Sequence, residues 1–222
     1  MRNLIFTAAL AFAGLFAVNA NAADFEAGKN YTELNQAVPV SQPGKIEVVE
    51  LFWYGCPHCY AFEPTINPWV EKLPADVHFV RIPAMFGGLW NIHGQLFLTL
   101  ESMGVEKKVH HSVFEKLHNN PKALAKPEEM ADFVAEQGVD KDKFLSTYNS
   151  FAIKGQIEKA KKLAMAYQVS GVPTLVVNGK YRFDIGSAGG PDEALQLADQ
   201  LIAKERAAAK SGGKEVGAMA PQ

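Results

Sequence analysis

The chain has 222 residues, of which 48% are hydrophobic and 10% aromatic. That is enough apolar material to bury a core in one domain, or in one domain with an insertion. The formal net charge is −2 and the runs of charge are short, so nothing indicates a nucleic-acid partner, which would require positive charge concentrated on one face.

The first 22 residues have the pattern of a secretory signal peptide. Arg2 provides the positive start, Leu4 to Val18 is almost wholly apolar, and Ala20-Asn21-Ala22 supplies the small residues of a cleavage site. The apolar run is 15 residues long, shorter than the roughly 20 that a membrane-spanning helix needs. We therefore expect residues 1–22 to be removed and the remainder to be exported.

The next segment predicts a βαβ unit. Ile46 to Tyr54 is a nearly continuous apolar run, which is typical of a strand buried on both faces. A helical pattern follows from Cys56 to Leu73, and because Pro64 and Pro68 lie within it, we expect a kink or a break there. Val77 to Ile82 is the second predicted strand.

The middle of the chain predicts helices only. Apolar residues recur at helical spacing over 89–103, 105–117 and 127–136, Asp140 is placed to cap a helix over 141–150, and a long helix follows over 151–167. We therefore expect residues 85–150 to form an all-helical domain. It would be inserted into an α/β frame made of residues 23–84 and 151–209.

The C-terminal part returns to strands. Thr174 to Val177 and Lys180 to Phe183 are short β segments joined by Asn178-Gly179, a strong signal for a hairpin. Asp192 to Arg206 has the spacing of a final helix. The composition then falls to Ala, Gly, Lys and Ser, so we expect residues 210–222 to form a disordered tail.

The two cysteines of the chain, Cys56 and Cys59, lie at the predicted junction of strand and helix. A disulfide between them would close almost no loop and would add little stability, which favours a redox role in an exported protein. A cysteine at the start of a helix meets unpaired N–H groups and the positive end of the helix dipole, and both favour its thiolate. Cys56 is therefore the candidate nucleophile and Cys59 the candidate resolving thiol.

The two residues between the cysteines adjust the redox balance. Pro57 is tolerated because the first helical turn leaves its N–H groups unpaired in any case. His58 can donate a hydrogen bond to the Cys56 sulfur or place positive charge beside it, and a more stable thiolate makes the disulfide more oxidising. The pattern favours donating disulfides over removing them. A zinc site is the alternative, but it would need a second cysteine pair that the sequence lacks, so we expect no metal and no cofactor.

Glu50 is the next candidate. It shares a strand face with apolar residues, so it is expected to be buried, where it either exchanges protons with Cys59 or is satisfied by a local lysine. The pattern leaves both open. Glu63 is expected at the surface, and the scattered histidines are expected on the surface or on helices: His78, His93, His110, His111 and His118.

Pro173 precedes the strand that starts at Thr174. If its peptide bond were cis, the backbone of Val172 would be presented to an extended peptide beside the cysteines. An ordinary trans turn proline is the alternative, and the sequence pattern leaves that choice open.

Two stretches carry a family resemblance. Phe52 to Tyr60 and Gly171 to Thr174 resemble the active-site motifs of the DsbA family of bacterial periplasmic dithiol oxidases, in particular its pseudomonad members. The resemblance covers nearly the whole mature chain. It implies a thioredoxin fold with an inserted all-helical domain, Cys56 as nucleophile, Cys59 as resolving thiol and His58 as a thiolate-stabilising residue, with Glu50 the buried acid and Pro173 a cis-proline preceded by Val172. The prolines at 64 and 68 and the long tail depart from the family pattern.

The resemblance also implies partners and a location. The substrates would be reduced, unfolded exported polypeptides in the periplasm, and a membrane quinone reductase of the DsbB type would reoxidise the protein, which we expect to be a monomer. The apolar start of the insertion, including Met85 and Phe86, would border the cysteines and hold substrate, unless these side chains only pack the insertion onto the frame. A disulfide isomerase or reductase, or a peptide-binding chaperone with incidental cysteines, are the alternatives.

Overall fold

The computed structural model describes residues 25–217. The predicted signal peptide, residues 1–22, and residues 218–222 of the predicted tail lie outside that range. The strands are β1 (Thr32–Glu33), β2 (Ile46–Phe52), β3 (Val77–Pro83), β4 (Thr174–Val177) and β5 (Tyr181–Asp184). The helices are α1 (Pro57–Glu71), α2 (Gly88–Ser102), α3 (Glu106–Asn119), α4 (Pro127–Glu136), α5 (Lys141–Tyr148), α6 (Phe151–Ala166), α7 (Ile185–Ala188) and α8 (Pro191–Gly217).

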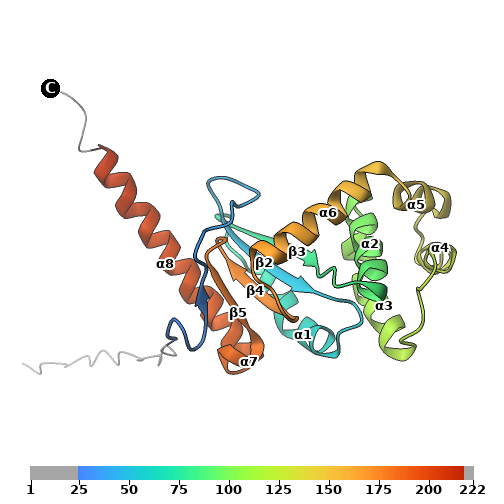
Figure 1. Ribbon diagram of the computed structural model, residues 1–222, viewed down its shortest axis with the longest axis horizontal. Coiled ribbons are helices and arrows are strands. Elements are labelled where there is room, and N and C mark those ends of the chain that lie inside the picture. Colours follow the sequence, from blue (N-terminus) through green and yellow to red (C-terminus); the bar gives the residue numbers. More distant parts are fainter. Residues whose placement is uncertain (1–24, 218–222) are drawn as a thin grey trace, which may run out of the picture.

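One mixed sheet lies at the centre of the molecule, in the order β1-β5-β4-β2-β3 (Figure 1). β2 pairs in parallel with β3 and antiparallel with β4, so the predicted βαβ unit is confirmed. Because β2 has neighbours on both sides, all of its seven residues except the first are buried. β4 and β5 form the predicted hairpin, and Asn178 and Gly179 adopt the positive φ angles, 51° and 65°, that its turn requires.

Helices cover both faces of the sheet. α1 and α8 pack on one face, where Val48 of β2 contacts Phe62 of α1 and the apolar side of α8. α6 packs on the other face, where Val49 and Leu51 meet Ala160. This alternation along β2 follows from the two-residue repeat of a strand, and it places Glu50 on the same face as Val48 and Phe52. The layers and the separate helical part can be followed in Figure 1.

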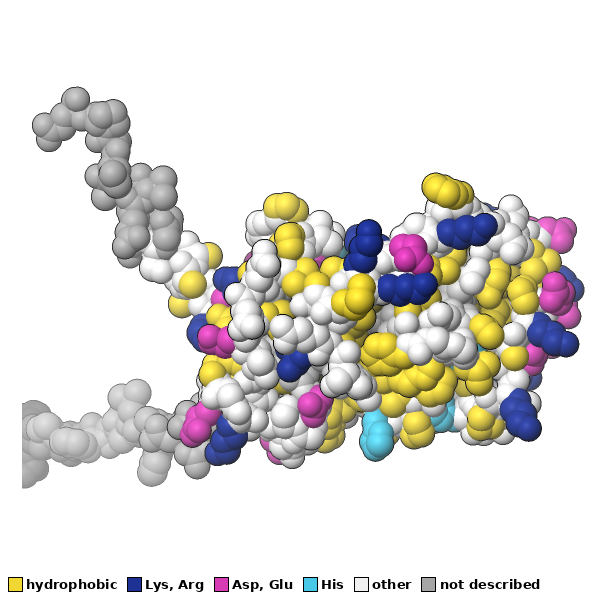
Figure 2. All heavy atoms as spheres, viewed as in Figure 1, with side chains coloured by type: hydrophobic (Ala, Val, Ile, Leu, Met, Phe, Trp, Pro, Cys, Tyr) yellow, Lys and Arg dark blue, Asp and Glu magenta, His cyan; other side chains and the backbone are white. Residues whose placement is uncertain are grey.

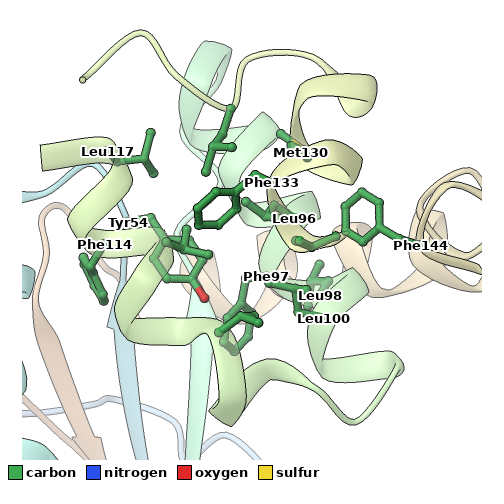
Figure 3. Close-up of a cluster of buried hydrophobic side chains, with 14 of the residues drawn as sticks. Tyr54, Leu96, Phe97, Leu98, Leu100, Phe114, Leu117, Met130, Phe133 and Phe144 are labelled. Carbon is green, nitrogen blue, oxygen red and sulfur yellow. The ribbon is translucent and has the colours of Figure 1, made fainter. Parts of the chain in front are cut away.

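α2 to α5 form the predicted helical insertion, with no strand among them. Its core is rich in phenylalanine and leucine, and Figure 3 shows side chains of α2, α3, α4 and α5 converging on it. The same cluster includes Phe52, Tyr54, Cys56 and Cys59 of the frame. The insertion and the cysteine pair are therefore packed into one continuous apolar region.

Two predictions about helices need correction. α1 is not broken at its prolines but runs continuously from Pro57 to Glu71. Pro64 and Pro68 are exposed and one turn apart, so the carbonyls that lose their helical N–H partners lie toward water. α8 continues past the expected end at Arg206 as far as Gly217, because the alanines after Arg206 are strong helix formers.

Two short elements, β1 and α7, had no signal in the sequence. Within residues 25–217, no helix combines the length and apolar character that crossing a bilayer demands.

Candidate active site

Cys56 is the N-cap of α1, directly after the turn that ends β2. Its backbone is extended, with φ −87° and ψ 117°, and its sulfur accepts a hydrogen bond of 3.4 Å from the backbone N–H of Cys59. Pro57 occupies the first helical turn. Gly55 is required before it, because a Cβ there would lie 2.3 Å from the Trp53 ring. The sequence thus places one sulfur at the positive end of a helix.

The two thiols have opposite acidities. The pKa of Cys56 is lowered to about 6, foremost by a hydrogen bond from the Cys59 side chain, against the opposing effect of burial. The backbone N–H groups of Cys59 and His58 and the charge of the exposed His58 ring lower it further, the last being the smallest of these causes. Burial raises the pKa of Cys59 far above that of an ordinary thiol. One sulfur is thus a thiolate near neutral pH and the other stays protonated.

The peptide bond between Val172 and Pro173 is cis, the first of the two arrangements considered above. The carbonyl oxygen of Val172 accepts a hydrogen bond of 3.5 Å from the Cys56 thiol. Beside it lies a groove of about 560 Å³, lined by side chains that include His58, Phe62, Phe183 and Ile185. The groove therefore runs from His58, which lies between the two cysteines in the chain, along the residues around Pro173.

Glu50 is buried beneath the cysteines with 1% of its surface exposed. It accepts a hydrogen bond of 2.8 Å from Nε of Arg81, so the cation beside it is an arginine, not the lysine that one of the two open readings named. Burial raises the pKa of Glu50, and the charge of Arg81 only partly opposes this. The charge of Glu50 in turn raises the pKa of Cys59, so the acid and the thiol are electrostatically coupled.

The prediction that Glu63 lies at the surface is wrong, whereas His110 lies on a helix, α3, as expected, and is buried there. Glu63 is 2% exposed and His110 5% exposed, and Nε2 of His110 lies 3.3 Å from Oε2 of Glu63. His93 is also buried, where its Nδ1 accepts a hydrogen bond of 3.2 Å from the Trp53 indole. One signal in the sequence could have indicated that Glu63 is buried. It lies four residues after Cys59, which is also buried, and residues four apart share a helix face.

Met85 and Phe86 differ from each other in exposure. Met85 is buried and packs against Gly94 of α2, as expected of a side chain that joins the insertion to the frame. Phe86 is 45% exposed and lies 5.0 Å from the Trp90 ring, which stacks on Trp53 beside the cysteines. Leu89 is also exposed. Figure 2 shows hydrophobic side chains gathered near the middle of the molecule, with histidine at the border of the patch.

Within residues 25–217, no group of three or more histidine, cysteine, aspartate and glutamate side chains is arranged to hold a metal ion. The cysteines are both free thiols. The site brings together the two sulfurs, the start of α1 and the buried Glu50.

Comparison with known proteins agrees with this geometry. A family model described as the DSBA-like thioredoxin domain matches residues 92–201. The thiol:disulfide interchange protein DsbA of Pseudomonas aeruginosa is 78% identical over 210 residues, which is 95% of this chain and 100% of that protein. DsbA of Pseudomonas syringae pv. tomato is 68% identical over 95% of this chain and 99% of its own. The crystal structure of Pseudomonas aeruginosa DsbA superposes with a TM-score of 0.82, at 80% identity, covering 84% of this chain and 97% of that one.

Proposed function

This chain belongs to the DsbA family of thiol:disulfide interchange oxidoreductases, and from that premise we propose that it donates its Cys56–Cys59 disulfide to reduced, unfolded polypeptides in the periplasm. A membrane quinone reductase of the DsbB type would then restore the disulfide. The observation that carries this direction is the contrast between an acidic Cys56 thiol and a buried, protonated Cys59 thiol.

The reaction proceeds by two exchanges. A substrate thiolate attacks the Cys56 sulfur, the Cys56–Cys59 bond breaks, and Cys59 leaves and takes up a proton. A second substrate thiolate then attacks the substrate sulfur bound to Cys56, which forms the substrate disulfide and releases Cys56 as a thiolate. Because the pKa of Cys56 is about 6, this thiolate is a good leaving group near neutral pH and the electrons flow from substrate to enzyme.

The groove beside Pro173 supports a polypeptide substrate. Its lining is mostly apolar and includes the backbone around Val172 and Pro173, so an extended chain can be held largely without reading its sequence. Phe86 is 45% exposed and packs on Trp90 at the start of the insertion, and we include it in the substrate surface together with Val172. Met85, its neighbour in the chain, is buried.

A redox titration of the Cys56–Cys59 couple against glutathione tests the direction of electron flow. We expect the couple to be oxidising relative to glutathione, and the protein to oxidise a reduced, unfolded secreted protein catalytically when an oxidant is supplied. A couple more reducing than glutathione would contradict the proposal and favour a reductase. Replacing both cysteines by serine should abolish the activity, whereas a chaperone would retain it.

The partner can be tested separately. The reduced protein should be reoxidised by membranes that contain a quinone reductase of the DsbB type and not by membranes that lack it. An equal rate with both membranes would contradict this part of the proposal. Analytical ultracentrifugation of the mature chain tests the proposed monomeric state.

A further inference from the structure

A cluster of charged side chains lies beneath the cysteine pair and joins three parts of the fold. Arg81 of β3 donates from Nε to Glu50 of β2 at 2.8 Å, and its Nη2 lies 3.4 Å from Glu63 of α1. His110, which the helical insertion contributes, lies 3.3 Å from Glu63. Its Nδ1 lies 2.8 Å from Glu106, one turn earlier on α3. We call these five residues the buried charge cluster.

The charges of the cluster balance only when His110 is protonated. Glu63 and Glu106 as carboxylates, Arg81 as a cation and His110 as an imidazolium sum to zero while Glu50 carries its proton. The two carboxylates outweigh the burial of His110 and raise its pKa, and burial keeps Glu50 protonated more readily than an ordinary glutamate. Removing the imidazolium charge would leave an uncompensated negative charge in an apolar surrounding, which is costly.

The cluster has its own opening to solvent. A cavity of about 300 Å³ is lined by Arg81 and Glu106, together with His78, Glu101 and Lys107. Its lining includes neither cysteine and no residue around Pro173, so it is distinct from the substrate groove. A proton can therefore reach the cluster from solvent while a polypeptide covers the cysteines.

We propose that His110 is a positioning residue of the redox centre: with Glu63 and Glu106 it connects Glu50 to the cavity on the far side, so that Cys59 can gain and lose its proton while the catalytic face is covered. The proposal rests on Cys59 being the resolving thiol. Through His110, the helical insertion would take part in moving the proton to and from Cys59 of the thioredoxin frame.

The proton balance requires such a route. When a substrate thiolate breaks the Cys56–Cys59 bond, the Cys59 sulfur takes the bonding electron pair and needs one proton. When an oxidant bound at Cys56 is displaced, Cys59 must give that proton up before its sulfur can attack. Cys59 is 0% exposed, so Glu50 is the acid and base placed to exchange this proton. After each exchange, the buried charge cluster returns Glu50 to its starting protonation state.

The other groups around His110 are aromatic or are part of the cluster. Tyr54, in the turn after β2, places its hydroxyl 2.9 Å from Nδ1 of His110, and its pKa is raised well above the ordinary value by burial, so it stays neutral. The rings of Phe52, Phe97 and Phe114 pack around the imidazole. On the α2 side, Glu101 also lines the cavity.

The test is the reaction of the reduced protein with glutathione disulfide, followed in its two steps. Cys56 first forms a mixed disulfide with glutathione, and Cys59 then displaces glutathione. In His110→Gln we expect the pH profile of the second step to shift to higher pH, and the step to become slower near neutral pH, because the charge of His110 lowers the pKa of Glu50. The first step and the acidity of Cys56 should not change.

His111→Gln is the matched control. His111 is the next residue of α3, is exposed and faces Glu115 at 3.5 Å, so both steps should match the wild type. A merely structural role of His110 would lower the melting temperature and slow both steps without shifting the profile of the second, and that result would overturn the proposal. Failure of Cys56 to react at all would instead contradict the proposed function.

Two further measurements test the coupling of His110 to Glu50, and the second does not require His110→Gln to fold. In a Glu50→Gln background, His110→Gln should add less than a twofold change, because His110 acts through Glu50; additive effects would contradict this. In the folded chain with His110 intact, the His110 ring followed by NMR should titrate at lower pH in Glu50→Gln than in the wild type, since the coupling is reciprocal. Identical titrations would also overturn the proposal.

Discussion

The sulfur of Cys56 lies 3.5 Å from the carbonyl oxygen of Val172, a residue 116 positions later in the chain. The register of the sheet explains the contact, because Leu51 near the end of β2 is paired with Thr174 at the start of β4. Only the thiol form of Cys56 can donate to this oxygen; neither the disulfide nor the thiolate that predominates near neutral pH carries the proton, because the pKa of Cys56 is about 6. We therefore expect the oxygen of Val172 to be left to accept a hydrogen bond from the backbone of a bound substrate.

Cys56 should titrate alone in the reduced protein. We expect the ultraviolet absorbance of thiolate to rise with a midpoint near pH 6, and a single thiolate to form below pH 9, because the pKa of Cys56 is about 6 and burial raises that of Cys59 far above the ordinary value. Cys56→Ser should remove the transition and Cys59→Ser should keep one. A midpoint near that of a free thiol would contradict the assignment of the nucleophile.

The stability of the reduced protein should depend on pH through Cys56. Its folded pKa, about 6, is below the ordinary value of 9.0, so its thiolate stabilises the fold fully above about pH 9 and loses that contribution as the pH falls through about 6. The melting temperature of the reduced protein should therefore rise relative to that of Cys56→Ser across this interval. Parallel curves for the two proteins would contradict the prediction.

His58→Ser should make the couple more reducing, but only modestly. The charge of His58 is the smallest of the causes that lower the pKa of Cys56, so we expect the equilibrium with glutathione to change by less than about tenfold, equivalent to one pKa unit. The gap between the unfolding midpoints of the reduced and oxidised forms should narrow accordingly. His111→Ser, which alters another exposed histidine, is the control, and an equal effect in both would refute a local role.

Glu50→Gln should slow the steps that move the Cys59 proton. We expect a loss of about a hundredfold in the displacement by Cys59, the lower part of the range for general acid–base catalysis, with the first attack by Cys56 little changed. Glu47→Gln is the matched control, because Glu47 is a buried glutamate of the same strand that binds Ser41 and not Arg81. Equal losses in both variants would indicate damage to β2 rather than lost proton transfer.

Phe86→Ser and Met85→Ser should have different effects on substrate oxidation and on stability. Phe86 is exposed, so its replacement should slow oxidation of a reduced unfolded protein while leaving a short dithiol peptide unaffected. Met85 is buried, so its replacement should slow both substrates and reduce the free energy of unfolding by about 2 kcal/mol or more. Equal losses on both substrates for Phe86→Ser, with a lower melting temperature, would exclude it from the substrate surface.

The strands and helices of the α/β frame could be predicted because the sequence patterns that indicate them are local. A continuous apolar run marks β2, Asn178-Gly179 marks the hairpin, and Asp140 caps α5 by accepting a hydrogen bond from Lys143. The cysteine pair was equally readable, since its position at the end of β2 follows from the order of strand, glycine and helix. These features depend on residues near one another in the chain.

The buried charge cluster was not predictable in the same way. Glu63 and His110 look like polar residues of amphipathic helices, and the sequence does not reveal that α3 places His110 against α1. Pro64 and Pro68 favoured a break in the helix that the structure does not show. Helix propensity alone does not reveal that both prolines face solvent on a well-packed helix. In each case the deciding contact joins residues far apart in sequence, or depends on which helix face is covered.

The cysteine pair has one more consequence, which concerns whether the protein can fold before it is oxidised. The sequence contains two cysteines, and the fold holds both as free thiols with the cores on each side of the sheet complete. No structural cross-link has to be made before the protein is native. We therefore expect newly made molecules to fold before any oxidant has been supplied to them, because their fold does not depend on a disulfide.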